Sequence, residues 1–199
     1  MIKNVVFDMG GVLIRYDPQY FLDRAGISDP EDRELLMKHV FRSVEWILQD
    51  WGRIDEPEME KIACEKLPAH LHKIAHDMIW GWNELADAIP GIREIIGDCK
   101  KAGFKIYVLS NASHRLHEYI KDLPGYGLWD GMIVSADVDA IKPMPEIYRA
   151  LLGKYDLKAE ECLFIDDMPA NIAGALNVGM QGFLLRNNVD ELRKLIFEQ

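Results

Sequence analysis

Residues 5–13 read Val5-Val6-Phe7-Asp8-Met9-Gly10-Gly11-Val12-Leu13. The β-branched and aromatic residues that begin this stretch are typical of a strand covered on both faces, as in a parallel sheet. The two glycines allow a tight turn and a close approach of the backbone to a ligand. In open α/β sheets, ligands bind at the carboxyl ends of the strands. We therefore expect Asp8 to lie at the end of a buried strand, beside a binding site.

Three later stretches also carry polar residues near the ends of apolar runs. Two apolar runs end directly at Ser110-Asn111 and at Asp166-Asp167, and a loop after a third run reaches Lys142-Pro143. Each motif is short and common, and a lone Asp after an apolar run is often only a helix or turn cap. The order along the chain is Asp, then Ser, then Lys, then an acidic pair. This order is a stronger indication of function than any single motif.

With these four motifs, the sequence resembles the haloacid dehalogenase-like hydrolases, and the resemblance covers nearly the whole chain. Within that family it is similar to the helical-cap phosphatases of the sugar 1-phosphate type. The resemblance implies a phosphomonoester hydrolase whose nucleophile, Asp8, forms an aspartyl-phosphate that is later hydrolysed. It implies catalytic roles for Ser110 and Lys142, and it places around the substrate Met9, Gly10, Ser110, Asn111 and Lys142. The expected substrate is a small phosphorylated metabolite such as a sugar phosphate.

The acidic residues indicate a metal ion. Three carboxylates that converge at one edge of a sheet repel one another unless a cation holds them, and hard oxygen ligands suit Mg²⁺. By resemblance, the ligands are the carboxylates of Asp8 and Asp167 and the backbone carbonyl of Gly10, and Asp166 binds directly or through water. The predicted cofactor is therefore Mg²⁺.

The remaining sequence predicts an α/β fold with one insertion. After residue 87, strands alternate with helices, which implies βαβ crossovers and a doubly wound, parallel-sheet, Rossmann-like core. Between residues 15 and 86, helical periodicity replaces strand signals, with helix N-caps expected at Asp29, Ser43 and Asp55. The helix after Ser43 is expected to carry Trp46, Ile47 and Trp51 and to stop at Gly52. We expect residues 1–14 and 87–199 to form the core, and residues 15–86 a small helical-bundle cap over the ends of the strands.

The composition limits the classes of partner. The chain has 199 residues, and 33 acidic against 23 basic residues give a formal net charge of −10. This excess of negative charge argues against binding to nucleic acid or to an anionic membrane. No run reaches the ~20 apolar residues of a membrane span, the amino terminus lacks a secretory signal pattern, and the three cysteines lack a metal-binding spacing. We expect a cytoplasmic enzyme with a small-molecule substrate, and the oligomeric state is left open.

One residue departs from the pattern of the family. Many of its phosphatases carry a second Asp two residues after the nucleophile, as general acid toward the leaving group and then as base for water, but Gly10 stands there. Loss of general acid–base catalysis typically costs about 10²–10⁴-fold in rate. The sequence therefore predicts a preference for a sugar 1-phosphate, whose leaving group needs little protonation, over the matching 6-phosphate. Arg53 and His114 are two candidates for an alternative proton donor.

Three other interpretations compete with a phosphatase. A 2-haloacid dehalogenase also uses a nucleophilic Asp, but its chemistry needs no metal, so the pair Asp166-Asp167 favours phosphoryl transfer. A response-regulator receiver combines similar residues, but its acidic pair lies near the amino terminus, whereas here the pair follows Lys142. A catalytically weak relative that binds phosphorylated metabolites is the interpretation that Gly10 keeps open.

Overall fold

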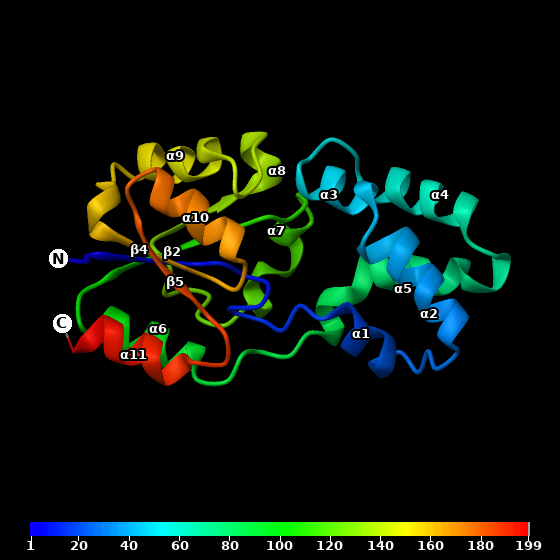
Figure 1. The fold of residues 1–199 in the computed structure, drawn as a ribbon, viewed down its shortest axis with the longest axis horizontal. Coiled ribbons are helices and arrows are strands. Elements are labelled where there is room, and N and C mark those ends of the chain that lie inside the picture. The colour runs from blue at the N-terminus through cyan, green and yellow to red at the C-terminus, as the bar shows by residue number, and fades with distance from the viewer. Residues whose placement is uncertain (199) are drawn as a thin grey trace.

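A computed structural model describes residues 1–198 of the chain. Its sheet lies between two layers of helices, and a second group of helices extends from one end of the sheet (Figure 1). The described residues form five strands: β1 (Asn4–Phe7), β2 (Lys105–Ser110), β3 (Gly131–Val134), β4 (Cys162–Asp166) and β5 (Gln181–Leu184). Neighbouring strands are parallel, in the order β3-β2-β1-β4-β5. The predicted fold class, a doubly wound parallel-sheet α/β core, is confirmed.

Strand β1 lies at the centre of the sheet. All of its residues are buried, as expected for an apolar strand with a layer of helices on each face. Its last residue, Phe7, pairs with Val108 of β2 and with Ile165 of β4. Because the three strands are in this register, the residues that follow them meet at one edge, and Asp8 comes next to Asp166.

Helices cover both faces of the sheet, as Figure 1 shows. One face packs against α6 (Ile92–Lys101) and α11 (Val189–Phe197), and the other against α9 (Pro145–Lys154) and α10 (Pro169–Asn177). On the second face, the ring of Tyr148 packs edge-on against Phe164 of β4, with ring centroids 5.6 Å apart. Two short helices, α7 (Leu116–Tyr119) and α8 (Ser135–Val138), follow β2 and β3. The packed layers hold the strand ends, and the side chains that follow them, in fixed positions.

The segment from residue 15 to residue 86, called the helical insertion below, contains no strand in the structure. It consists of α1 (Pro18–Arg24), α2 (Pro30–Leu36), a π-helical turn (Met37–Phe41), α3 (Val44–Asp50), α4 (Glu56–Lys66), α5 (His72–Gly81), and 3₁₀ turns at Ala69–Leu71 and Trp82–Leu85. The side chains of Asp29, Ser43 and Asp55 accept hydrogen bonds from the first turns of α2, α3 and α4, so these predicted N-caps are confirmed. Among residues 1–198, no helix combines the length and the apolar character needed to cross a membrane.

The chain enters and leaves the helical insertion through two adjacent segments. The backbone N–H of Arg15 donates to the carbonyl of Asp87 at 2.7 Å, and the N–H of Ile89 donates to the carbonyl of Leu13 at 3.0 Å. These bonds lie beside the junctions predicted at residues 14/15 and 86/87, and the division into domains stays a prediction. They fasten the insertion next to the loop that follows Asp8.

Helix α3 begins after Ser43, as predicted, and turns apolar residues outward. Ile47 is 50% exposed and Val44 is 60% exposed. The buried side instead carries Trp46 and the polar Gln49, which is only 4% exposed. This orientation places Trp46, Gln49 and Asp50 on the inner face of α3, which lines a cavity with polar walls.

Candidate active site

Asp8 follows β1, and two donors fix its carboxylate. The backbone N–H of Met9 donates to Asp8 Oδ1 at 2.6 Å, and Lys142 Nζ lies 2.6 Å from the same oxygen. Burial raises the pKa of Asp8 well above its usual range, the charge of Lys142 opposes this rise, and the charge of Asp166 adds to it. The carboxylate therefore depends on nearby cations to remain charged and nucleophilic.

The loop after β1 approaches the acidic pair closely because residue 11 is glycine. Gly11 has a φ of +74°, in the left-handed region that favours glycine. A Cβ atom on Gly11 would lie 2.4 Å from the carboxylate carbon of Asp167. A side chain at this position would therefore separate Asp167 from the loop that holds Asp8.

Lys142 reaches Asp8 from the loop before α9. Its backbone is clamped by Asn111, whose Oδ1 accepts from the Lys142 N–H at 2.7 Å and whose Nδ2 donates to the Lys142 carbonyl at 3.1 Å. Burial lowers the pKa of Lys142, but the carboxylates of Asp8 and Asp166 outweigh burial and raise it above the ordinary value. The ammonium group therefore remains charged beside the nucleophile.

Asp166 forms a second ion pair with Lys142. Its carboxylate is completely buried, and Oδ2 lies 2.9 Å from Lys142 Nζ. Asn171 Nδ2 donates to its two oxygens at 3.1 and 3.0 Å, and the N–H of Met168 donates to Oδ1 at 2.8 Å. Both oxygens of Asp166 are thus already engaged by protein donors.

The acidic cluster offers oxygen ligands to a divalent cation. Asp8, Asp166 and Asp167 each place a carboxylate oxygen within 4.8 Å of the others. In the part of the chain that the structure describes, no donor or cation of another residue pairs with the Asp167 carboxylate, and burial and the charge of Asp166 raise its pKa. Close carboxylates that repel one another suit Mg²⁺, so the donors present fit the predicted cofactor. Asp8 and Asp167 are the better placed ligands, and the role of the Gly10 carbonyl stays a prediction.

Ser110 ends β2 at the same edge of the sheet. It is 1% exposed, and its hydroxyl donates to the carbonyl of Asn111 at 3.4 Å. It does not belong to the residues that line the cavity described next, although its neighbour Asn111 does. The proposed contact between the Ser110 hydroxyl and phosphate stays a prediction.

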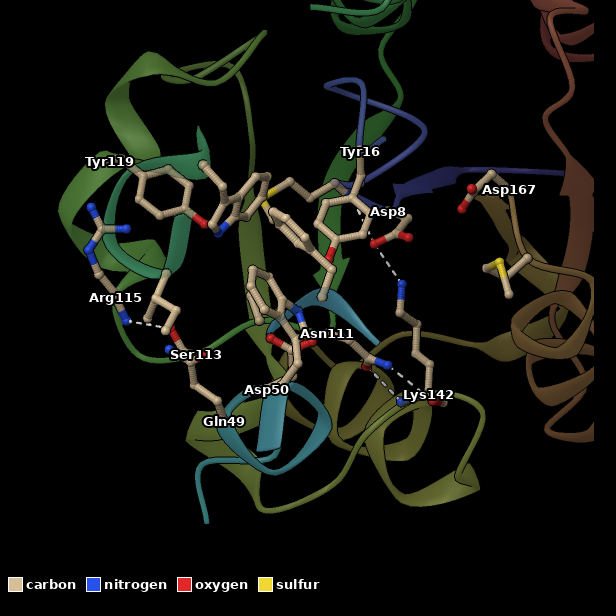
Figure 2. Close-up of a pocket in the computed structure, with 18 of the residues that line it drawn as sticks. Asp8, Tyr16, Gln49, Asp50, Asn111, Ser113, Arg115, Tyr119, Lys142 and Asp167 are labelled. Atoms are coloured by element: carbon tan, nitrogen blue, oxygen red, sulfur yellow. Dashed lines mark hydrogen bonds and ion pairs between the residues drawn. The ribbon is translucent and has the colours of Figure 1, made fainter. Parts of the chain in front are cut away.

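A cavity of about 300 Å³ lies between the sheet edge and the helical insertion (Figure 2). The side formed by the core is called the phosphate side below, because the sequence predicts that its residues surround a phosphate: Asp8, Met9, Gly10, Asn111, Lys142 and Asp167. Its insertion side is formed by side chains of residues 15–86: Tyr16, Trp46, Gln49, Asp50, Glu56 and Trp82. The segment after β2 closes one end with Ser113, Arg115 and Tyr119. The structure thus brings together the predicted residues Asp8, Lys142 and Asp167 with a second set that the sequence did not single out.

Asp50 is the most unusual member of this second set. Burial raises its pKa to about 7, Glu56 adds to the rise, and Lys142 and a hydrogen bond to Trp46 oppose it. Trp46 and Asp50 stand four residues apart in α3 and therefore share one face of the helix. That spacing, in a helix predicted to bury Trp46, was the available sequence signal that Asp50 points inward.

The two proton donors considered from the sequence lie elsewhere. Arg53 forms an ion pair with Asp139 at 2.6 Å, and His114 Nδ1 lies 3.1 Å from Asp137 Oδ1. Neither Arg53 nor His114 lines the cavity. In this structure, both are surface residues with carboxylate partners.

A comparison with known protein families assigns the chain to one of them. Residues 2–179 match the family model of the haloacid dehalogenase-like hydrolases. The chain is a haloacid dehalogenase-like hydrolase. The membership predicted from the four motifs is confirmed, and with it the assignment of the protein as a hydrolase.

This hydrolase is similar to proteins that act on phosphate compounds. It is 25% identical over 205 residues to the sesquiterpene phosphatase astK of Aspergillus oryzae, covering 98% of this chain and 96% of that one. It is 28% identical to the chloroplast flavin mononucleotide hydrolase 1 of Arabidopsis thaliana, covering 96% and 74%. Its fold matches a haloacid dehalogenase-family enzyme of Bacteroides thetaiotaomicron solved with magnesium and inorganic phosphate, with a TM-score of 0.69, 21% identity and coverage of 94% and 96%.

In this hydrolase, the space beside Gly10 is occupied. A Cβ atom on Gly10 would lie 3.2 Å from the Cβ of Tyr16. Burial raises the pKa of Tyr16 well above its usual range, and the charge of Asp50 adds to the rise. Tyr16 therefore packs tightly against the position that a side chain at residue 10 would take, and its ring is close enough to Asp50 for the charge of Asp50 to act on it.

Proposed function

We propose that this protein is a Mg²⁺-dependent phosphomonoester hydrolase that acts through an aspartyl-phosphate on Asp8. The observation that carries the proposal is the position of the Asp8 carboxylate, which lies 2.6 Å from Lys142 Nζ and lines the cavity together with Asp167. An ionised carboxylate among cations is suited to attack phosphorus, because the cations also stabilise the negative charge of the transferred group.

Each residue of the phosphate side has a proposed role in catalysis. Asp8 supplies the attacking oxygen, and Lys142 stabilises negative charge on the phosphoryl oxygens. The backbone N–H groups of Met9 and Asn111, with the hydroxyl of Ser110, are the proposed donors to the remaining oxygens. Asp8 and Asp167, with the Gly10 carbonyl and Asp166, would hold Mg²⁺, which supplies further positive charge when bound.

The cavity supports a small phosphorylated metabolite as substrate. Its volume of about 300 Å³ is at the lower end of the range for small-molecule sites. The insertion side combines the aromatic surfaces of Trp46 and Trp82 with the polar groups of Gln49, Asp50 and Glu56. Aromatic surface with hydrogen-bonding groups suits a hydroxylated leaving group such as a sugar. In this proposal the helical insertion acts as a cap that selects the leaving group.

A screen of phosphorylated metabolites for phosphate release tests this function. Release from at least one phosphomonoester with Mg²⁺, and its loss on addition of EDTA, is the expected result. Metal-independent halide release from a 2-haloacid would instead establish a dehalogenase. Binding of phosphate and Mg²⁺ without turnover of any ester would establish a catalytically weak relative.

A further inference from the structure

Helix α3 presents polar side chains to the interior of the protein and apolar ones to solvent. Val44 and Ile47 are 60% and 50% exposed. Gln49 is 4% exposed, and both Gln49 and Asp50 line the cavity. A helix that only packs against a core shows the opposite arrangement. The inward polar residues therefore need an explanation other than packing.

The side chain of Gln49 has no hydrogen-bond partner among the described residues 1–198. Its amide is not among the fully buried polar groups without a partner, so it is open to the cavity and can bond to whatever occupies that space. The side chain borders the cavity that also contains Asp8. A ligand with hydroxyl groups would satisfy it, so this wall of the cavity is suited to a polar leaving group.

The carboxylate of Asp50 shares the same wall. A hydrogen bond links it to Trp46 of the same helix, and the charged or titratable groups that act on it from other elements are Lys142 of the loop before α9, Glu56 of α4, Tyr16 of the segment before α1 and Tyr119 of α7. Lys142 is the only cation in this set. The environment raises the pKa of Asp50 to about 7, so both protonation states are accessible near neutral pH, as acid–base catalysis requires.

Asp50 and Asp8 face the same small space. Both line the cavity of about 300 Å³, which is the scale of one small molecule. Lys142 contacts Asp8 directly and also lowers the pKa of Asp50 electrostatically. In a phosphate ester attacked by Asp8, the leaving oxygen lies on the side of phosphorus opposite Asp8. Asp8 and Asp50 both line the cavity that the ester would occupy (Figure 2).

We propose that Asp50 is the general acid and base of this enzyme, in place of the carboxylate that Gly10 lacks. The inference rests on the proposed function and adds the residue that handles the proton. When Asp8 Oδ attacks phosphorus, the bond from phosphorus to the leaving oxygen breaks, and the proton of Asp50 moves to that oxygen to give an alcohol. Asp50 then takes a proton from water, whose oxygen attacks phosphorus and breaks its bond to Asp8. Inorganic phosphate leaves, and Asp50 is again protonated.

The test compares leaving groups in the Asp50→Asn protein. With an alkyl ester such as a hexose 6-phosphate, whose leaving group needs a proton, kcat/KM should fall by about 10²–10⁴-fold. With 4-nitrophenyl phosphate, whose phenolate leaves unprotonated, formation of the aspartyl-phosphate should slow by less than about tenfold, measured as the burst of nitrophenolate. The matched control is Asp77→Asn, because Asp77 is an exposed carboxylate of the same helical insertion, paired with Lys73 and outside the cavity.

Two further readouts separate catalysis from structure. The native rate with the alkyl ester should fall as pH rises past about 7, where Asp50 loses its proton, and Asp50→Asn should remove this limb. Affinity for inorganic phosphate with Mg²⁺ should stay within about twofold, because Asp50 does not belong to the phosphate side.

An equal loss of rate with both leaving groups, or no loss with either, would overturn the role of Asp50. If the native protein hydrolyses no phosphate ester, the proposed function fails, and this inference falls with it.

Discussion

The two sides of the cavity differ in how completely their polar groups are satisfied. On the phosphate side, Asp166 has donors on both oxygens, and Lys142 is held by two carboxylates and by Asn111. On the insertion side, the Gln49 amide lacks a partner among the described residues, and burial raises the pKa of Asp50. On the phosphate side, the carboxylate without a partner is Asp167, a predicted Mg²⁺ ligand. On the insertion side, the leaving group of a substrate would complete the hydrogen bonds. The contrast separates the residues expected to bind and attack the phosphoryl group from those expected to contact the leaving group.

The largest expected effect is the loss of phosphate release when the proposed nucleophile is replaced. Asp8→Asn should lower phosphate release by about 10⁴-fold or more, because the amide lacks the charge needed for attack. The side-chain volume is nearly unchanged, so the melting temperature in the absence of Mg²⁺ should not fall. Single-turnover phosphate release and thermal unfolding measure the two quantities. Release at the native rate would contradict a covalent intermediate on Asp8.

Removal of the buried cation should destabilise the phosphate side. Lys142→Met leaves Asp8 and Asp166 buried without their counterion, which should cost about 3–5 kcal/mol in the free energy of unfolding. Added Mg²⁺ should restore part of this loss. The control is Lys105→Met, because Lys105 is 60% exposed in its ion pair with Asp130 and such surface pairs contribute little to stability. Equal losses in urea denaturation would show that the buried pair has no special role.

On the insertion side, removal of a buried charge should stabilise the protein. Because the pKa of Asp50 is raised to about 7 in the folded protein, its contribution to stability is present below pH 4 and is lost as pH rises toward 7. Asp50→Asn should therefore stabilise the protein by about 2–4 kcal/mol at pH 8 and have little effect near pH 4. Melting temperatures of the native and variant proteins across this pH range measure the difference. A difference independent of pH would show that Asp50 is not held in its protonated form by folding.

A smaller effect, on Mg²⁺ affinity, is expected from Asp167, the predicted metal ligand without a protein partner. Asp167→Asn should weaken Mg²⁺ binding on the order of tenfold, because the site loses one of its charged oxygens. Calorimetric titration with Mg²⁺ measures the affinity, and the Mg²⁺ dependence of phosphate release should shift by the same factor. Unchanged affinity would place the ion away from Asp167.

The smallest effect is expected at Gly10. A Cβ there would lie 3.2 Å from Tyr16, so the carboxylate in Gly10→Asp is poorly placed, and kcat/KM should change by less than about tenfold. With Asp50 as acid, the preference for a hexose 1-phosphate over the 6-phosphate predicted from Gly10 should be modest in the native protein and larger in Asp50→Asn. The ratio of kcat/KM for the two esters, measured in the native protein and both variants, sharpens the distinction between the two positions.

The sequence was informative where one local pattern determines one structural outcome. Apolar runs followed by polar residues located β1, β2 and β4, and because parallel strands align their carboxyl ends, the same runs placed Asp8 near Asp166. The N-caps at Asp29 and Ser43 were also readable, since a cap depends only on its own helix turn. Those patterns are local, and tertiary packing did not change them.

The insertion side could not be predicted in the same way. In α3, an apolar residue such as Ile47 suggests a buried face, but the helix turns Gln49 and Asp50 inward because they border a cavity between distant segments. The pKa of Asp50 depends on Lys142 and Glu56, which lie far from it in the sequence or in another helix. Periodicity describes one helix at a time and does not contain these contacts.

The paired entry and exit of the helical insertion also have an evolutionary consequence. Because Leu13 bonds to Ile89 and Arg15 bonds to Asp87, the two ends of the insertion meet at one point of the core. A different helical segment could be exchanged between these ends by recombination without altering the order or register of the five strands. Such an exchange would replace Gln49 and Asp50 together and keep Asp8 and Lys142. Under the proposed function, such an exchange would change the side of the site that contacts the leaving group and leave the proposed nucleophile in place.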